Sequence, residues 1–246
     1  MKILISPAKK MRVEEDLLPW RELPAFLPKT ERLMRFVQGL SYGEAKGLWA
    51  CNDSIAELNF GRFRRMDLYA GLTPALFSYE GIQYQYLAPR VLEEEALEYL
   101  QEHLRILSGF YGILKPFDGV TPYRLEMQAK AGVDGCRDLY EFWGKDLADF
   151  LMGEDREILN LASREYAVAV ERGLDAGSRE VTCIFGERVG EKIVQKGTKA
   201  KMARGEMVRF LAEQGAKEME TAKEFQRLEY RYQEELSSEN EWVFLR

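Results

Sequence analysis

MKILISPAKK, residues 1–10, contains the first strand of the fold and the first candidate for a functional site. Ile3, Leu4 and Ile5 form a short continuous apolar run, which predicts a buried strand. Ser6 can cap a helix and Pro7 is favoured in a first helical turn, so we expect a helical turn directly after this strand. Apolar runs of the same kind recur along the chain, and they predict a sheet at the centre of the protein.

The rest of the chain predicts one mixed α+β domain, residues 1–246, with a central mixed sheet. No internal repeat, low-complexity tract or linker divides it, and strands and helices alternate too irregularly to predict a Rossmann fold or a TIM barrel. The expected elements are helices at 30–40, 43–59, 91–102, 137–152 and 199–214, a strand-like aromatic segment at 74–87, strands from 103 and at 156–162, a hairpin at 180–195 turning near Gly186 and Glu187, and two strands in 224–246.

Composition excludes several classes of protein. The formal net charge is −6, so a basic field over the whole surface is absent and any polyanion must bind a local patch. The cysteines are far apart and the one histidine is His103, so we expect reduced thiols, no metal site and a core position for the histidine. Without a Walker A sequence or a GxGxxG turn, no cofactor is predicted.

The apolar run near the N-terminus is too short for a signal peptide. No stretch approaches the roughly 20 apolar residues of a membrane span. We therefore expect a cytoplasmic protein with no membrane partner.

Two segments place cations near predicted helix N-termini. If Ser6 caps a turn, Lys9 and Lys10 oppose the helix dipole, whereas the free backbone N–H groups there favour an anion. The same pattern recurs after Thr198, as described next. The alternative is that the turn is not helical and both lysines are solvated.

The second segment, residues 196–210, holds five basic residues and one acidic residue and is the most basic window of the chain. Thr198 is the expected cap, Lys199 and Lys201 lie in the first turn, and Lys199 and Arg204 flank the apolar stripe. This arrangement predicts a second anion site. The alternative is a solvated helix face whose side-chain stems cover the edge of the core.

The third segment, residues 115–127 (KPFDGVTPYRLEM), is a loop stiffened by prolines and glycine. Such a loop can hold Lys115 and the guanidinium fork of Arg124 beside a phosphate or carboxylate. Glu126 is a candidate general base. The alternative is an internal salt bridge between Arg124 and Glu126.

Two further motifs follow predicted strands. Gly109-Phe110-Tyr111-Gly112 resembles the tight turn of a helix-hairpin-helix, which presents backbone N–H groups to a DNA phosphate, although plain glycine turns are more common. Asn160, Ser163 and Tyr166 follow the strand at 156–162, and Ser163 is the expected cap of a short helix.

Taken together and in order, these motifs resemble the YaaA family along essentially the whole chain. The resemblance rests on these blocks: ISPAKKM at 5–11, the Asn59–Arg62–Phe63 cluster, HLRILSGFYGILKPFDGVTPYRLEM at 103–127, LYEFWG at 139–144, LNLASREY at 159–166, TKAKMARGEMVRF at 198–210, and Tyr232 through Phe244.

The resemblance implies a peroxide-stress protein that limits iron-linked damage to DNA. It implies an unusual α+β fold with a basic cleft, a helix-hairpin-helix-like element and binding of double-stranded or distorted DNA. The family's residues carry over to Lys9, Arg62, Lys115 (where arginine is usual), Arg124, Glu126, Lys199 and Arg204, whereas the slot of Lys10 often holds threonine in relatives. Together with Lys10 these cations are the candidate anion-binding residues, and Ser6, Asn160, Ser163 and Tyr166 are the candidate supporting polar residues.

Two functions fit these residues. The first is binding of duplex DNA by a monomer, with the predicted cations converging on one cleft. The second is an enzyme that acts on a small phosphorylated or nucleotide-like substrate, with Glu126 as acid or base. DNA binding is the preferred function. A carboxylate and several hydroxyl groups among the cations support the enzyme as the alternative, because phosphate contacts alone do not require a carboxylate.

Overall fold

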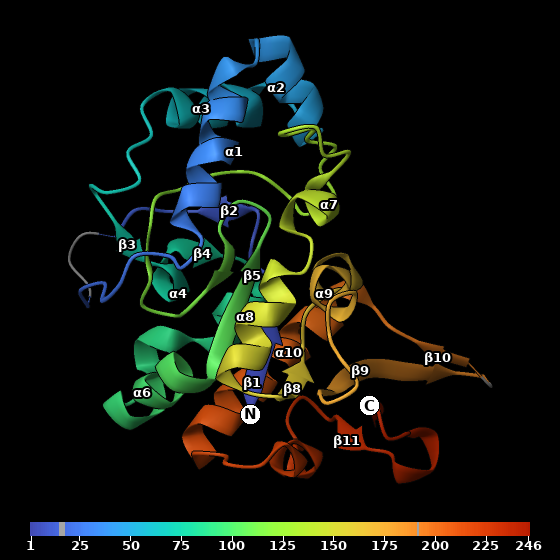
Figure 1. Ribbon diagram of the computed structural model, residues 1–246. Coiled ribbons are helices and arrows are strands. Elements are labelled where there is room, and N and C mark those ends of the chain that lie inside the picture. The colour runs from blue at the N-terminus through green and yellow to red at the C-terminus, as the bar shows by residue number, and fades with distance from the viewer. Residues whose placement is uncertain (15–17, 191) are drawn as a thin grey trace.

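The computed structural model describes residues 1–14, 18–190 and 192–246, and the predicted first strand lies in the middle of its large sheet (Figure 1). This strand, β1 (Lys2–Ile5), pairs in parallel with β5 (Leu104–Ser108) on one side and β8 (Glu157–Asn160) on the other. Every residue of β1 and β5 is buried. Burial on both faces explains why these strands are continuous apolar runs and do not alternate with polar residues.

The large sheet confirms the predicted α+β class and is mixed, with mostly parallel strands. Its order is β11 (Arg231–Tyr232), β12 (Glu241–Leu245), β9 (Arg179–Val189), β8, β1, β5 and β6 (Gly112–Leu114), and β10 (Lys192–Val194) pairs with β9 off this path. Within the described residues the five strands from β12 to β5 are parallel, and β11 and β6 pair antiparallel to them at the edges.

The parallel core follows a doubly wound order, which the sequence pattern did not predict. From β1 the chain passes to β5 on one side, then returns across β1 to β8 and continues to β9 and β12. The reversal lies between β1 and β8, the place where open α/β sheets bind ligands. The many short helices between β1 and β5 hide the alternation of strands and helices in the sequence.

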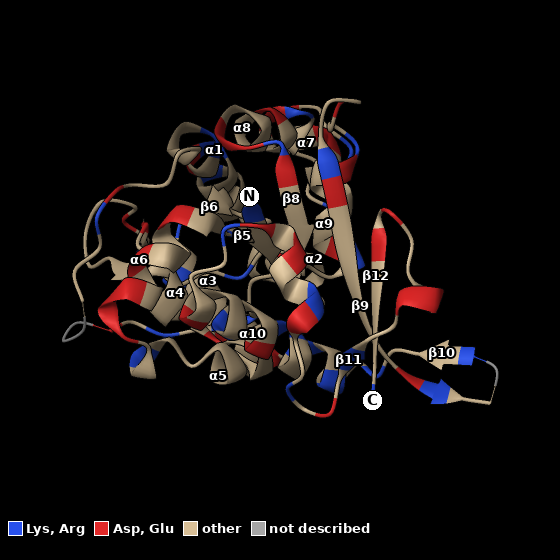
Figure 2. Cartoon of the chain, turned by 90° about the horizontal axis from the view of Figure 1, so that it is seen from below, with Lys and Arg blue, Asp and Glu red and all other residues tan. Residues whose placement is uncertain are grey.

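Helices lie on both sides of this core. In Figure 2, α8 lies on one side of the strands and α10 with α5 on the other, and basic and acidic segments are interleaved along the chain. The helices are α1 (Leu27–Gly39), α2 (Tyr42–Trp49), α3 (Asp53–Arg64), α4 (Ala75–Ser78), α5 (Ile82–Leu87), α6 (Glu94–His103), α7 (Leu139–Trp143), α8 (Asp146–Glu154), α9 (Arg164–Glu171) and α10 (Gly197–Gln214), with 3-10 turns η1 (Pro89–Val91), η2 (Met219–Glu224) and η3 (Glu234–Leu236).

The helices α1, α2 and α3 form a group at the end of the molecule away from the C-terminus (Figure 1). Two small ladders lie outside the large sheet: β2 (Lys10–Met11) with β4 (Tyr79–Glu80), and β3 (Thr73–Pro74) with β7 (Gly119–Val120).

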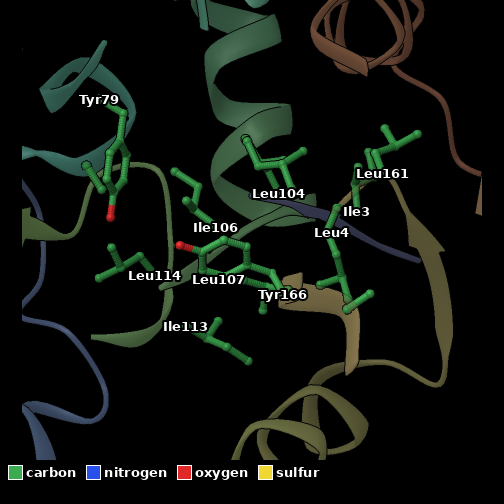
Figure 3. Close-up of a cluster of buried hydrophobic side chains, with 14 of the residues drawn as sticks. Ile3, Leu4, Tyr79, Leu104, Ile106, Leu107, Ile113, Leu114, Leu161 and Tyr166 are labelled. Carbon is green, nitrogen blue, oxygen red and sulfur yellow. The ribbon is translucent and has the colours of Figure 1, made fainter. Parts of the chain in front are cut away.

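Apolar side chains from the central strands form one buried cluster with two tyrosine rings. Figure 3 shows how the side chains of the parallel strands and of the β5–β6 hairpin meet those rings. The labelled residues, all buried, are Ile3, Leu4, Tyr79, Leu104, Ile106, Leu107, Ile113, Leu114, Leu161 and Tyr166.

Two predicted helices are each divided in the structure. The helix predicted at 43–59 breaks at Ala50, which has a left-handed backbone (φ 44°), and Asn52 then caps α3 by accepting the Ile55 N–H at 3.0 Å. The helix predicted at 137–152 breaks at Gly144 (φ +56°), where only glycine lacks the steric penalty. Apolar periodicity alone does not reveal such breaks.

The structure corrects the predicted helix starts at Ser6 and Thr198. The residues directly after β1 are not helical, so Ser6 caps no helix and the Pro7 turn is not helical. Helix α10 begins at Gly197 with Lys196 at the capping position, and no side chain caps it. Thr198 therefore lies inside the helix.

Three further corrections concern strands and turns. The aromatic segment 74–87 is mainly α4 and α5, with only two-residue strands at its bends. The 180–195 hairpin exists, but β9 continues through Gly186 and the chain reverses around Gly190 (φ +62°). The Gly109–Gly112 turn joins two antiparallel strands, β5 and β6, so its interpretation as a helix-hairpin-helix is wrong.

The approach of α10 to α5 depends on Gly205. A Cβ atom at this position would lie 2.1 Å from the carbonyl oxygen of Gln83 and 2.9 Å from the backbone nitrogen of Leu87. Both neighbours are backbone atoms of α5, so they cannot rotate away as a side chain would. Only glycine at position 205 allows the two helices to touch.

We therefore expect Gly205→Ala to lower the free energy of unfolding by about 1–3 kcal/mol, the usual cost of overpacking, despite the better helix propensity of alanine. Gly197→Ala in the same helix is the matched control, because a Cβ there has no atom within 4 Å. Urea unfolding of both variants measures the difference. Equal stability of the two variants would contradict this account of the contact.

Candidate functional site

A pocket of about 390 Å³ lies at the ends of β1 and β8. Because these strands are parallel and adjacent, the segments that follow them emerge at the same edge of the sheet. The pocket, which we call the anion pocket, is lined by five segments of the chain: 6–10, 80–84, 123–126, 163–166 and residues 201 and 204 of α10.

Ser6 connects three walls of the anion pocket. The Ser163 N–H donates to Ser6 Oγ at 2.8 Å, and Ser6 Oγ donates to Ser163 Oγ at 3.1 Å. The Tyr84 hydroxyl donates to the Ser6 carbonyl oxygen at 3.0 Å. Ser163 is the N-cap residue of α9, as predicted, but its side chain bonds to Ser6 and caps no N–H of the helix.

The 123–126 segment is held in place by close backbone packing and a buried hydroxyl chain. A Cβ atom at Gly109 would lie 2.6 Å from the Leu125 carbonyl oxygen, so the glycine allows the β5–β6 turn to contact this segment. The Tyr123 hydroxyl bonds to Ser108 Oγ at 2.6 Å and to the Tyr79 hydroxyl at 2.9 Å. The backbone beside Tyr123 is therefore fixed.

Glu126 pairs with two of the predicted cations. It forms an ion pair with Lys9 Nζ at 2.5 Å and accepts a hydrogen bond from an Arg124 guanidinium nitrogen at 2.8 Å. The Arg124–Glu126 salt bridge that the sequence left as an alternative is therefore present. Lys10 pairs with Glu80 at 2.6 Å, and this hydrogen bond lowers the pKa of Glu80.

Three buried donors of the anion pocket lack a partner among the residues that the structure describes. They are Nε2 of Gln83, Nε of Arg124 and Nε of Arg204. Arg204 is half-buried as a residue, and its Nε is the part that is fully buried without a hydrogen-bond partner in this part of the chain. Burial lowers the pKa of this guanidinium, so its charge is costly to keep in place.

The charge of the anion pocket favours an anion. Among the described residues its lining has five cationic side chains and three carboxylates. Two of the carboxylates are held by Lys9, Arg124 and Lys10, and burial raises the pKa of the third, Glu165, toward its neutral form. Positive charge remains at Arg204 and at the exposed Lys201.

Eight predicted site residues line this pocket and four do not. The structure brings together Ser6, Lys9, Lys10, Arg124, Glu126, Ser163, Tyr166 and Arg204. Elsewhere, Lys115 pairs with Glu22 at 2.9 Å and Lys199 with Glu187 at 2.6 Å.

The other two predicted residues outside the pocket hold backbone in place. Arg62 donates to the Met11 carbonyl oxygen at 3.0 Å. Asn160 accepts the Ala162 N–H at 2.9 Å and donates to Glu180 at 2.9 Å. These contacts account for both side chains without a ligand.

Comparisons with known proteins match this chain to one family over nearly its full length. The family model described as peroxide stress protein YaaA matches residues 1–236. The chain belongs to this family. Similar proteins include UPF0246 proteins from Lachnoclostridium phytofermentans, 56% identical over all of this chain and 96% of the relative, and from Desulfitobacterium hafniense, 53% identical over all of this chain and 98% of the relative. A UPF0246 protein from Pediococcus pentosaceus is 48% identical, also over all of this chain and 98% of the relative.

Several residues of this family member's pocket were not among the predicted site residues, and Lys201, Gln83 and Glu165 are three of them. Lys201 lies three residues before Arg204 in α10, a spacing that places both on one helix face and could have identified it. Gln83 was hidden because its segment was expected to be strand-like. Glu165 follows the expected cap Ser163, but nothing in the sequence shows that it is half-buried beside Glu126.

Within the described part of the chain, no group of three or more His, Cys, Asp or Glu side chains is arranged to hold a metal ion. None of the helices described is both long and apolar enough to pass through a bilayer.

Asp118 lies in the third segment, three residues after Lys115, and its carboxyl has a shifted pKa. Its carboxylate is 3% exposed and accepts the Lys115 N–H at 2.9 Å. Burial raises the pKa of Asp118 to about 7. Because the unfolded chain releases this proton near its ordinary pKa, the free energy of unfolding must fall as pH rises from about 4 to 7.

We expect Asp118→Asn to flatten this decline, since the amide oxygen can still accept the Lys115 N–H and no proton is lost. Burial also raises the pKa of Glu180 to about 7, so part of the slope remains in the variant. Urea unfolding at a series of pH values tests the change. A variant whose profile parallels that of the wild type would show that Asp118 does not titrate in this range.

Proposed function

We propose that the anion pocket binds a small ligand bearing a phosphate or carboxylate group, and that this binding serves the peroxide-stress role of the family. The observation that carries the proposal is Arg204, which is half-buried in the wall and whose buried Nε has no partner among the described residues. A buried cation is costly unless it is paired. A bound anion would supply the missing partner.

The chemistry of the donors fits such an anion. A guanidinium presents its N–H groups in a planar fork that matches phosphate and carboxylate oxygens. Arg204 on α10, Arg124 in the 123–126 segment and Gln83 on α5 approach from three different elements. Donors from separate rigid elements favour a ligand of defined shape over a mobile counterion.

The geometry favours a small ligand over a duplex. The volume of about 390 Å³ is in the range of small-molecule sites. Binding of a duplex in one cleft requires the predicted cations to converge, but Arg62, Lys115 and Lys199 form their contacts outside the pocket. Catalysis on a small ligand would use Glu126, held by Lys9 and Arg124, as the general base.

Binding of double-stranded or distorted DNA is the second candidate function, and the rim of the pocket supports it. The side chains of Lys9 and Lys10 are 63% and 79% exposed, and Lys201 is also exposed. Lysines in this position can contact backbone phosphates. Such binding would place the protein on the DNA that a peroxide-stress protein protects from iron-linked damage.

Thermal unfolding with inorganic phosphate tests the first function. At 100 times its dissociation constant, phosphate should stabilise the wild type by about 2.7 kcal/mol, which raises the melting temperature by roughly 5–10 °C for a chain of this size. Arg204→Ala should lose most of this rise. Lys199→Ala is the matched control on the same helix and should retain it, because Lys199 pairs with Glu187 outside the pocket.

The same variants with a labelled DNA duplex, titrated across salt concentrations, separate the two functions. Loss of the phosphate effect in Arg204→Ala with no duplex binding by the wild type supports the small ligand alone. Duplex binding that weakens steeply with salt and is lost in Arg204→Ala supports DNA. The first proposal is refuted if no anion stabilises the wild type or if both variants respond as it does.

A further inference from the structure

A second cavity adjoins the anion pocket. It has a volume of about 610 Å³ and shares five lining residues with the anion pocket: Lys10, Glu80, Gly81, Ile82 and Tyr84. The two cavities therefore meet along the start of α5. A Cβ atom at Gly81 would lie 3.1 Å from Ala8 Cβ, so a larger residue at this position would crowd Ala8 where the cavities adjoin.

The second cavity, which we call the apolar groove, differs from the anion pocket in chemistry. Leu76, Phe77 and Tyr79 are at most 3% exposed and form its floor, and Pro89 and Val91 lie in the lining of the same groove. Aromatic rings and aliphatic side chains of this kind favour a planar, uncharged group.

Each cation of the apolar groove has a carboxylate partner within the described residues. Arg12 pairs with Glu14 at 3.0 Å and lies 3.6 Å from Glu80, and Arg90 pairs with the same Glu14 carboxylate. Lys10, which lines both cavities, pairs with Glu80. The groove therefore has no cation, in this part of the chain, that is free to hold an anion as Arg204 is.

We infer that the two cavities hold one ligand, a nucleoside monophosphate, with its phosphate in the anion pocket and its base in the apolar groove. This inference rests on the proposed small-anion function and names the class of ligand. The pairing of the cations sets the orientation of the ligand, since Nε of Arg204 lacks a described partner at one end, whereas each cation at the other end has a carboxylate partner.

The junction between the cavities supplies the contact that a sugar requires. Glu80 lines both cavities, and the hydrogen bond from Lys10 lowers the pKa of its carboxyl, so it is ionised at neutral pH. An ionised carboxylate accepts strong hydrogen bonds from hydroxyl groups, and acidic residues bind ribose hydroxyls in this way at doubly wound sheets. The anion pocket thus suits the phosphate, Glu80 suits the sugar, and the apolar groove suits the base.

Gln85 offers a way to fill the apolar groove without touching the anion pocket. This residue lines only the groove, and it is exposed on α5. Gln85→Trp should occupy the space of the base, and Gln85→Ala is the matched control that leaves the groove open. Thermal unfolding of both variants checks that each remains folded.

Calorimetric titration with inorganic phosphate, ribose 5-phosphate and adenosine 5′-monophosphate tests the inference. The wild type should bind the nucleotide about tenfold or more tightly than ribose 5-phosphate, because stacking and burial of the base add favourable free energy. Gln85→Trp should remove this difference and leave phosphate binding unchanged, whereas Gln85→Ala should retain it.

The possible results separate this inference from the proposed function. Equal affinity for the nucleotide and ribose 5-phosphate overturns the bipartite site and leaves the anion pocket standing. A nucleotide preference that persists in Gln85→Trp places the base outside the groove and also overturns the inference. No binding of any of the three anions to the wild type overturns the proposed function as well.

Discussion

The parallel pairing of β1 with β8 is the constraint on which the rest of the site depends. It brings the two segments that follow these strands to one edge of the sheet, although they are more than 150 residues apart, as the Ser6–Ser163 hydrogen bonds show. The strand order reverses at this pair, so no crossover connection fills the edge. A pocket between β1 and β8 is a direct consequence of the topology.

Packing around this edge then decides which side chains reach the pocket. Gly205 allows α10 to touch α5, which places Arg204 beside Gln83, and Gly109 allows the β5–β6 turn to contact the segment of Arg124 and Glu126. The resulting lining is rich in buried donors. Burial and the shortage of described acceptors make these donors costly in the unliganded protein, so the same contacts that stabilise the fold favour an anion.

The sequence predicted the helices and strands that are marked by a pattern of neighbouring residues. The apolar runs of β1, β5 and β8 and the periodicity of α10 were sufficient to place those elements, and the polar motifs beside them contained eight of the residues that line the pocket. The aromatic segment 74–87 was expected to be strand-like because Phe and Tyr favour strands. Contact with α10 at Gly205 instead favours the helix α5 there.

Long-range pairing could not be predicted from the sequence. Lys199 and Lys115 have the same local features as Lys9, but they bind Glu187, 12 residues away, and Glu22, 93 residues away. Hydrogen bonds from Lys196 and Lys199 lower the pKa of Glu187 to about 2, and Arg246 lies 3.3 Å from the same carboxylate. No spacing rule distinguishes a lysine with a distant partner from one at a pocket.

The most direct measurement of the central claim is the NMR signal of the arginine Nε–H groups in protein labelled with ¹⁵N-arginine, recorded during titration with inorganic phosphate. The account predicts that the Arg204 Nε–H signal, assigned by its loss in Arg204→Lys, shifts at saturation and exchanges more slowly with water, because the anion supplies its partner. A signal from Arg204 that stays unchanged while phosphate binds elsewhere on the protein would contradict the account.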